Sequence, residues 1–219
     1  MRIKFYVPFI LCLSLIVFSS MMLKPKRIVF FGDSITQAAV NEDGYITILS
    51  DKLKAPDYEL IGAGIGGNKI YDLYLRIEED VLQKNPDLVV VYVGINDVWH
   101  KKTSHTGTDY DKYIQFYQAV IDRIKESGSE VVLCTPSVIG EKPNGQNDLD
   151  EDLDKYSGAI RELAKKNNVP LCDLRVLFGE YEQQHNQDNL EKGVLTTDGV
   201  HLNKKGNQLV ADSLLPFLK

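Results

Sequence analysis

The chain has 219 residues, which is enough for one substantial domain and cramped for two. Hydrophobic residues make up 43% of it and charged residues 26%, as in an ordinary soluble globular protein. The formal net charge of −6 disfavours nucleic acids and anionic polymers as partners, because these require clustered Lys and Arg, and it is compatible with a neutral substrate.

The first 23 residues have a different character from the rest of the chain. Arg2 and Lys4 precede an uncharged, mostly apolar run over residues 5–23, which predicts a secretory signal cleaved after Ser19. A retained membrane anchor is the alternative, because a run of this length could just span a bilayer core. Under either interpretation we expect a catalytic domain over residues 26–219 outside the cytoplasm, with membrane contact only through residues 1–23 if they are retained.

The remaining chain alternates between two kinds of hydrophobic pattern. Short apolar, β-branched runs predict buried strands, and apolar residues spaced three or four apart predict helices. Strands are expected over 27–31, 58–61, 87–93, 131–135 and 171–174, and helices over 45–53, 70–82, 110–125, 150–167 and 203–215. This alternation predicts an α/β fold, a five-stranded parallel sheet with helices on both faces.

Residues able to form a catalytic triad lie at opposite ends of this domain. Ser34 follows the first predicted strand, and Asp198 and His201 lie three residues apart in a Gly-containing turn. Either segment alone is more typical of a turn or helix cap. Together they supply the nucleophile, the base and the carboxylate of a Ser-His-Asp triad, since a hydroxyl needs a neighbouring base to attack at neutral pH. The sequence therefore predicts a hydrolase.

Two further blocks follow the second and third predicted strands. The segment 62–67 matches G-x-G-x-x-G, but it does not follow the first strand, and the acidic residue of a dinucleotide site is missing at the end of the next strand. Its glycines are better suited to bring backbone N–H groups close to a developing oxyanion. Asn96, in the block Gly-Ile-Asn-Asp, offers a side-chain amide for the same purpose.

These four blocks together resemble the SGNH/GDSL hydrolase family, from about Lys26 to the C-terminus. The resemblance implies a three-layer α/β/α, flavodoxin-like fold and an acyl-enzyme mechanism that needs no metal or cofactor. It also implies an oxyanion hole formed by the N–H of Ser34, the N–H of Gly64 and the amide of Asn96. The family often has asparagine where this chain has Gly62, so an alignment of Gly66 in place of Gly64 stays open. Asp97 is expected to brace its loop.

The expected activity is that of a serine esterase acting on short-chain or acetyl esters, with acetyl esters on carbohydrate among the candidates. A lysophospholipase or thioesterase acting on lipid acyl chains is the alternative, since the same residues would serve it. A noncatalytic SGNH-fold binding protein is a third possibility, against which the complete set of Ser34, Asp198 and His201 argues. The loop over residues 138–152 follows the fourth strand, and we expect it to border the site and shape the pocket.

Other residues carry weaker predictions. Cys134 and Cys172 lie in predicted strands and are expected to be buried thiols, with a disulfide as the alternative. The four histidines lack the ligand spacing of a zinc site. Trp99 and His100 follow the Asn96 block and are candidates for a pocket wall, with exposure as the alternative for His100. Five tyrosines are expected to pack on helices rather than bind sugar. These are Tyr71, Tyr74, Tyr110, Tyr113 and Tyr117.

Overall fold

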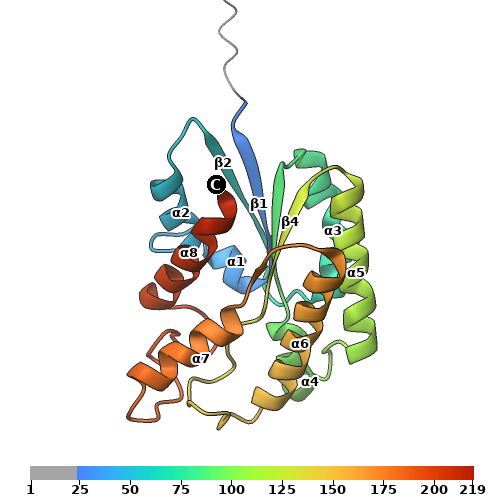
Figure 1. The fold of residues 1–219 in the computed structure, drawn as a ribbon. Helices are drawn as coiled ribbons and strands as arrows, with labels where there is room; N and C mark the ends of the chain where they lie inside the picture. Colours follow the sequence, from blue (N-terminus) through green and yellow to red (C-terminus); the bar gives the residue numbers. More distant parts are fainter. Residues whose placement is uncertain (1–23) are drawn as a thin grey trace, which may run out of the picture.

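The computed structural model describes residues 24–219, so the predicted signal or anchor lies outside the described residues. Five parallel strands form one sheet in the order β2-β1-β3-β4-β5, with helices on both faces (Figure 1). The strands are β1 (Lys26–Gly32), β2 (Tyr58–Gly64), β3 (Leu88–Tyr92), β4 (Glu130–Cys134) and β5 (Leu171–Cys172). The predicted α/β fold with a five-stranded parallel sheet is confirmed.

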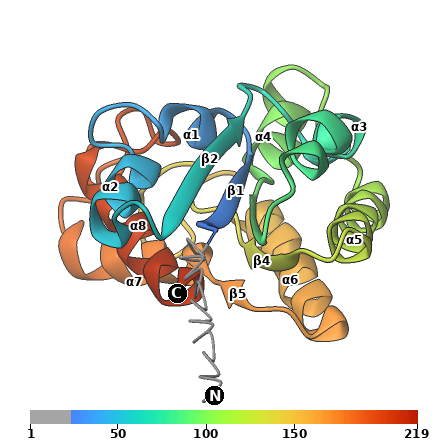
Figure 2. The same ribbon diagram turned by 90° about the horizontal axis from the view of Figure 1, so that it is seen from above.

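The helices form a layer on each side of this sheet (Figure 2). They are α1 (Ser34–Ala38), α2 (Tyr45–Leu53), α3 (Ile70–Asp80), α4 (Ile95–Thr103), α5 (Tyr110–Glu126), α6 (Asp150–Asn167), α7 (Leu174–His185) and α8 (Lys204–Leu218), with a short 3₁₀ turn, η1 (Leu82–Lys84). α2 packs against α8 on one face, and α5 packs between α3 and α6 on the other. None of the helices within residues 24–219 combines the length and the apolar character that crossing a bilayer takes.

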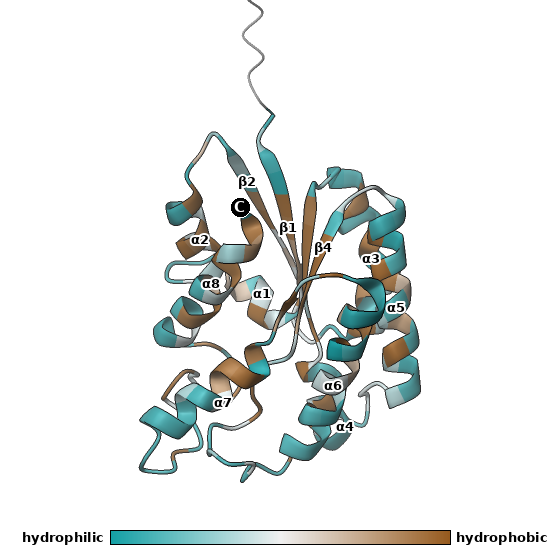
Figure 3. Cartoon of the chain, in the orientation of Figure 1, coloured by the Kyte–Doolittle hydropathy of each residue, from teal (hydrophilic) through white to brown (hydrophobic). Residues whose placement is uncertain are grey.

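The two helical layers explain why the central strands are apolar on both sides. All five residues of β3, Leu-Val-Val-Val-Tyr, are buried, and β1 is buried from Ile28 to its end. A strand covered on both faces cannot alternate apolar and polar residues without burying unpaired polar groups. Figure 3 shows the consequence, with hydrophobic strands at the centre and hydrophilic outer helix surfaces.

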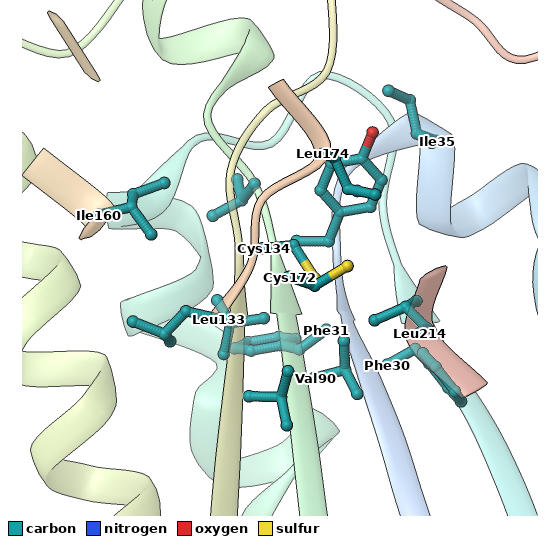
Figure 4. Close-up of a cluster of buried hydrophobic side chains, with 14 of the residues drawn as sticks. Phe30, Phe31, Ile35, Val90, Leu133, Cys134, Ile160, Cys172, Leu174 and Leu214 are labelled. Atoms are coloured by element: carbon teal, nitrogen blue, oxygen red, sulfur yellow. The ribbon is translucent and has the colours of Figure 1, made fainter. Parts of the chain in front are cut away.

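Cys134 and Cys172 lie side by side in this core (Figure 4). They are register partners at the ends of β4 and β5, and both are buried free thiols. Burial raises the pKa of the Cys134 thiol well above its ordinary value, and the neighbouring Cys172 raises it further. The two residues act as small apolar side chains at this position, as the sequence predicts.

The topology places a reversal of strand order between β1 and β3. The chain leaves β1 toward the layer of α2 and leaves β3 toward the layer of α5, although these two strands are hydrogen-bonded neighbours. In open parallel sheets, ligands bind beyond the carboxyl ends of the strands at such a point. Gly32, paired with Tyr92, marks the end of both strands.

The largest differences from the sequence-based expectation are three helices and two strand ends. The hydrophobic pattern does not predict α1, α4 or α7. The first two of these helices are short, and each begins within two or three residues of a strand end. β2 runs on to Gly64, through residues expected to form a turn. β5 ends two residues early because Asp173 caps α7, its side chain accepting a hydrogen bond from Val176 N–H.

Candidate active site

Ser34 lies at the junction between the central strand β1 and helix α1. Asp33 caps α1, and its carboxylate accepts a hydrogen bond from the N–H of Ile35 at 3.0 Å. Asp33 is buried, and its carbonyl accepts a further hydrogen bond from Gln37 N–H, so the first turn of α1 around Ser34 is fixed next to the end of β1. The Ser34 side chain is half-buried at the carboxyl edge of the sheet.

Asp198 and His201 reach the same edge from the other end of the chain. His201 Nε2 lies 3.1 Å from Ser34 Oγ, and His201 Nδ1 lies 2.8 Å from Asp198 Oδ2. The second carboxylate oxygen of Asp198 accepts the backbone N–H groups of Val200 at 3.0 Å and His201 at 2.8 Å. The structure thus brings the three predicted triad residues into one hydrogen-bonded chain.

The electrostatics keep Asp198 charged. Partial burial raises its pKa, but the hydrogen bonds from the His201 ring and from the two backbone N–H groups outweigh it, so the pKa falls below the ordinary 3.8. An ionised Asp198 accepts the proton on Nδ1, which leaves Nε2 as the acceptor facing Ser34. This is the tautomer that a base for the Ser34 hydroxyl requires.

Asn96 lies in the first turn of α4, directly beyond the end of β3. Its side chain is only 3% exposed, and its Nδ2 donates to the carbonyl of Asn68 at 3.1 Å. A primary amide has two N–H groups, so one holds the turn around Asn68 while the other is left to donate elsewhere. The sequence did not indicate this second function of the Asn96 amide.

The structure gives Gly64 a packing role. A Cβ at Gly64 would lie 2.1 Å from the backbone N of Gln37, so only glycine lets β2 approach α1 this closely. Ile65 N–H donates to the carbonyl of Gly32, and because strand amides alternate in direction, the N–H of Gly64 points away from β1. This register argues against the predicted position of the Gly64 N–H in the oxyanion hole.

Gly66 and Gly67 are placed differently. The N–H of Gly66 is already bonded to Gln37 Oε1 at 2.8 Å. Gly67 has a φ of +77°, and the nearest atom to a Cβ there would be His100 Cε1 at 3.9 Å. Gly67 is therefore the least crowded of these three glycines, and it directly precedes Asn68, whose carbonyl accepts the Asn96 amide.

Asp97, the neighbour of Asn96, braces the structure as the sequence suggests. It is fully buried and accepts hydrogen bonds from the Thr108 hydroxyl and from the N–H of Ile70, the first residue of α3. Burial raises its pKa to about 7 despite these bonds. Burial raises the pKa of Asp33 to about 7 in the same way, although its bond from Ile35 and the proximity of His201 oppose the rise.

A cleft of about 350 Å³ opens beside Asp198. The loop between β4 and α6 forms one wall and the turn carrying Asp198 another, so the prediction that this loop borders the site is confirmed. Trp99 lines the cleft, and its ring meets that of His201 edge-on with centroids 6.5 Å apart. The full lining is Trp99, Ile139, Gly140, Lys142, Gln146, Asn147, Asp148, Glu191, Lys192, Asp198, Gly199 and Val200.

The structure also shows where His100 and two of the predicted tyrosines lie. His100 is half-buried beside Trp99, and burial together with the nearby Lys69 lowers its pKa. Tyr113 and Tyr117 are fully buried and pack edge-on, so they belong to the core.

Within residues 24–219, no group of three or more His, Cys, Asp or Glu side chains is arranged to hold a metal ion.

The structure brings out one further residue near the site that no sequence pattern indicates. Glu141 lies in the loop between β4 and α6 and is fully buried. Its carboxylate accepts three backbone N–H groups from the segment that precedes Asp198. A single glutamate in a polar loop carries no local signal of such a role, because its partners lie more than 50 residues further along the chain.

Comparisons with known proteins agree with this geometry. Residues 30–209 match the model of the GDSL-like lipase/acylhydrolase family. A crystal structure of an acetyl xylan esterase is 54% identical, with a TM-score of 0.87, over 88% of this chain and 100% of that one. An acetylxylan esterase of Geobacillus stearothermophilus is 27% identical over 87% of this chain and 92% of its own length. An isoamyl acetate-hydrolyzing esterase 1 homolog of Rattus norvegicus is 26% identical, over 88% of this chain and 81% of its own.

Proposed function

The chain belongs to the GDSL-like lipase/acylhydrolase family and is a carboxylic ester hydrolase, and on this premise we propose that it removes acetyl groups from xylan or xylooligosaccharides. Two similar proteins carry that activity in their names, one of them 54% identical to this chain. The observation that carries the mechanism is the 3.1 Å contact between Ser34 Oγ and His201 Nε2 beside an ionised Asp198.

The proposed reaction begins when Ser34 Oγ attacks the acetyl carbonyl carbon and His201 Nε2 takes the hydroxyl proton. Asp198 stabilises the resulting imidazolium through its bond to Nδ1. His201 then gives the proton to the sugar oxygen as the bond between that oxygen and the carbonyl carbon breaks. Water, deprotonated by His201, releases acetate from Ser34 and restores the enzyme.

The tetrahedral intermediates carry a negative oxygen that needs fixed donors. We assign the N–H of Ser34 and the free N–H of the Asn96 amide to this oxygen. For the third donor we favour the N–H of Gly67 over that of Gly64. Gly67 is the least crowded glycine of its block and directly precedes Asn68, which the Asn96 amide holds, whereas the N–H of Gly64 points away from β1.

The cleft beside Asp198 supports a carbohydrate substrate over a lipid one. A long acyl chain requires an apolar groove, whereas sugar hydroxyls require hydrogen-bonding side chains around them. Most of the side chains in this cleft are polar or charged, including Gln146 and Asn147, and Trp99 adds an aromatic surface against which a sugar ring can lie.

Export is part of this proposal. Residues 5–23 have the apolar composition of a secretory signal or anchor, and a xylan polymer is met outside the cytoplasm. Cell fractionation followed by N-terminal sequencing of the mature protein tests it. We expect activity in the exported or membrane fraction, and activity confined to the cytoplasm would contradict export.

The substrate is tested by two measurements on the same preparation. Rates over p-nitrophenyl esters from acetate to palmitate should be highest at acetate, and acetate should be released from acetylated xylooligosaccharides. A rate that rises toward palmitate would support the lipid alternative. Hydrolysis of p-nitrophenyl acetate without acetate release from the oligosaccharides would contradict the proposed substrate but leave the esterase intact.

A further inference from the structure

Glu141 differs from the other buried acidic residues because its side chain accepts hydrogen bonds from the backbone N–H groups of three consecutive residues. It is 0% exposed, and within residues 24–219 it forms no ion pair. The carboxylate is satisfied by backbone alone: Oε2 accepts the N–H of Val194 at 2.8 Å, and Oε1 accepts those of Leu195 and Thr196 at 2.6 Å each. Buried charge is retained only where such bonds compensate its desolvation.

The three N–H groups belong to the segment that carries the base of the triad. Residues 193–203 contain neither helix nor strand, apart from a single bridge between Thr196 and Leu202. Bonds inside the segment shape it: the hydroxyl of Thr196 accepts Gly199 N–H, and Thr197 N–H donates to the carbonyl of His201. These bonds do not attach the segment to the sheet.

Two sets of bonds hold the segment in place, one from its own last residue, Asn203, and one from the loop after β4. Asn203 caps α8 and bonds through its side chain to the carbonyls of Val194 and Thr196. Glu141 accepts the N–H groups of the same stretch, and its neighbour Gly140 adds a bond from its N–H to the carbonyl of Gly199 at 2.8 Å. The loop after β4 is thereby joined to the turn of Asp198 and His201.

We propose that Glu141 is a positioning residue that sets the distance between His201 and Ser34 by anchoring the N–H groups of Val194, Leu195 and Thr196. This inference rests on the proposed function of the triad. Glu141 touches neither substrate nor the reacting atoms, and it acts through the backbone that leads to Asp198. A shift of about 1 Å in a reacting group lowers a rate by roughly 100-fold, so three bonds on this segment bear directly on turnover.

The chemistry of the side chain makes the substitution Glu141→Gln informative. Glutamine has nearly the same shape, but one acceptor oxygen becomes an NH₂ group that faces a backbone N–H donor. We expect kcat for p-nitrophenyl acetate to fall about 10–100-fold in E141Q, with KM changed by less than about threefold. The shorter E141D keeps both acceptors but withdraws them by one methylene, and it should lose about 10-fold in kcat.

Two control variants separate positioning from stability. E162Q removes the same charge from an exposed site on α6. L163A creates a cavity at a buried site near the end of α6 that lies at the opposite edge of the sheet, so it destabilises the fold without reaching the triad segment. Both should keep kcat within twofold when assayed well below their melting temperatures.

A readout that needs no ester substrate completes the experiment. The rate at which diethyl p-nitrophenyl phosphate modifies Ser34, followed by intact mass, depends on His201 as the base. We expect this rate to fall in E141Q in parallel with kcat. E141Q, or E141D if E141Q does not fold, reacting as fast as the wild type would overturn the inference. Absence of acetyl release by the wild type, with Ser34 still modified, would instead count against the proposed substrate.

Discussion

The two halves of the triad are held in place by different kinds of structure. Ser34 follows a central strand that is hydrogen-bonded to neighbours on both sides, and its turn is fixed by a buried cap. Asp198 and His201, with side chains 48% and 38% exposed, lie on a segment without regular structure that is attached mainly by side-chain-to-backbone bonds. The nucleophile is therefore positioned by packing and the base by polar contacts. We expect substitutions in the two regions to differ in how steeply they lower kcat.

Replacement of Ser34 by alanine should have the largest effect. The strand and helix that position Ser34 keep their fold without its hydroxyl, so we expect kcat to fall by a factor of roughly 10⁶ with an unchanged melting temperature. Rates on p-nitrophenyl acetate measure this, and S50A on the exposed surface of α2 is the matched control. Undiminished turnover by S34A would remove Ser34 from the mechanism.

Asp198→Asn tests the segment that carries the base. The amide can present an N–H to His201 Nδ1, which would favour the tautomer with the proton on Nε2, and kcat should fall by about 10⁴. D188N, at an exposed loop position, serves as the control. Loss of less than tenfold would show that His201 does not depend on this carboxylate.

Asn96→Ala tests the region that the sheet positions, because Asn96 lies directly beyond the end of β3. We expect kcat to fall by roughly 10²–10³, the usual loss for one oxyanion donor. The KM should change little, because the donor acts on the developing charge. A change in kcat within twofold would indicate that another group holds the oxyanion.

Glu182→Gln should have the smallest effect, and it concerns stability. Burial raises the pKa of Glu182 to about 8, and the charge of Glu141 adds to the rise while Arg175 opposes it and Asp150 supports it. The side chain is buried, and one carboxyl oxygen has no hydrogen-bond partner among the described residues. Because the folded state binds this proton more tightly than the unfolded state, the stabilisation is complete below pH 4.5 and is lost as the pH rises through 8.

The measurement is the free energy of unfolding of wild type and E182Q from pH 5 to 9. The wild type should lose about 4 kcal/mol relative to the variant over this interval, because about three pH units separate pH 5 from the raised pKa. Asp33 and Asp97 also have raised pKa values, but they titrate in both proteins and cancel in the difference. Parallel curves for the two proteins would contradict an ionisable Glu182 in the fold.

The sequence predicts most of the architecture because its patterns are local. The periodicity of residues 45–53 and 150–167 matches α2 and α6 at both ends. The extension of β2 through Gly62 could not be seen, since glycines are typical of turns and the contact that requires glycine here, with the Val40 side chain 2.5 Å from the place of a Cβ, is a tertiary one. The helix α7 escaped prediction because one of its three buried side chains is the polar Glu182.

Some residues of the candidate site could likewise be predicted from the sequence, and others could not. Asp198 and His201 could be found because they contact each other in the structure and are also only three residues apart in the sequence. The choice between Gly64 and Gly67 depends on the strand register, which the sequence does not contain. Glu141 binds backbone groups, which are present at every residue, so nothing in the sequence of its partners marks them.

The pairing of Ser34 with His201 is the claim on which the account depends, and labelling of the serine tests it most directly. The enzyme would be treated with diethyl p-nitrophenyl phosphate, digested, and its peptides mapped by mass. We predict one added diethylphosphoryl group, located at Ser34 and absent from His201→Ala treated in the same way. A label at another residue, or full labelling of Ser34 without His201, would contradict the account.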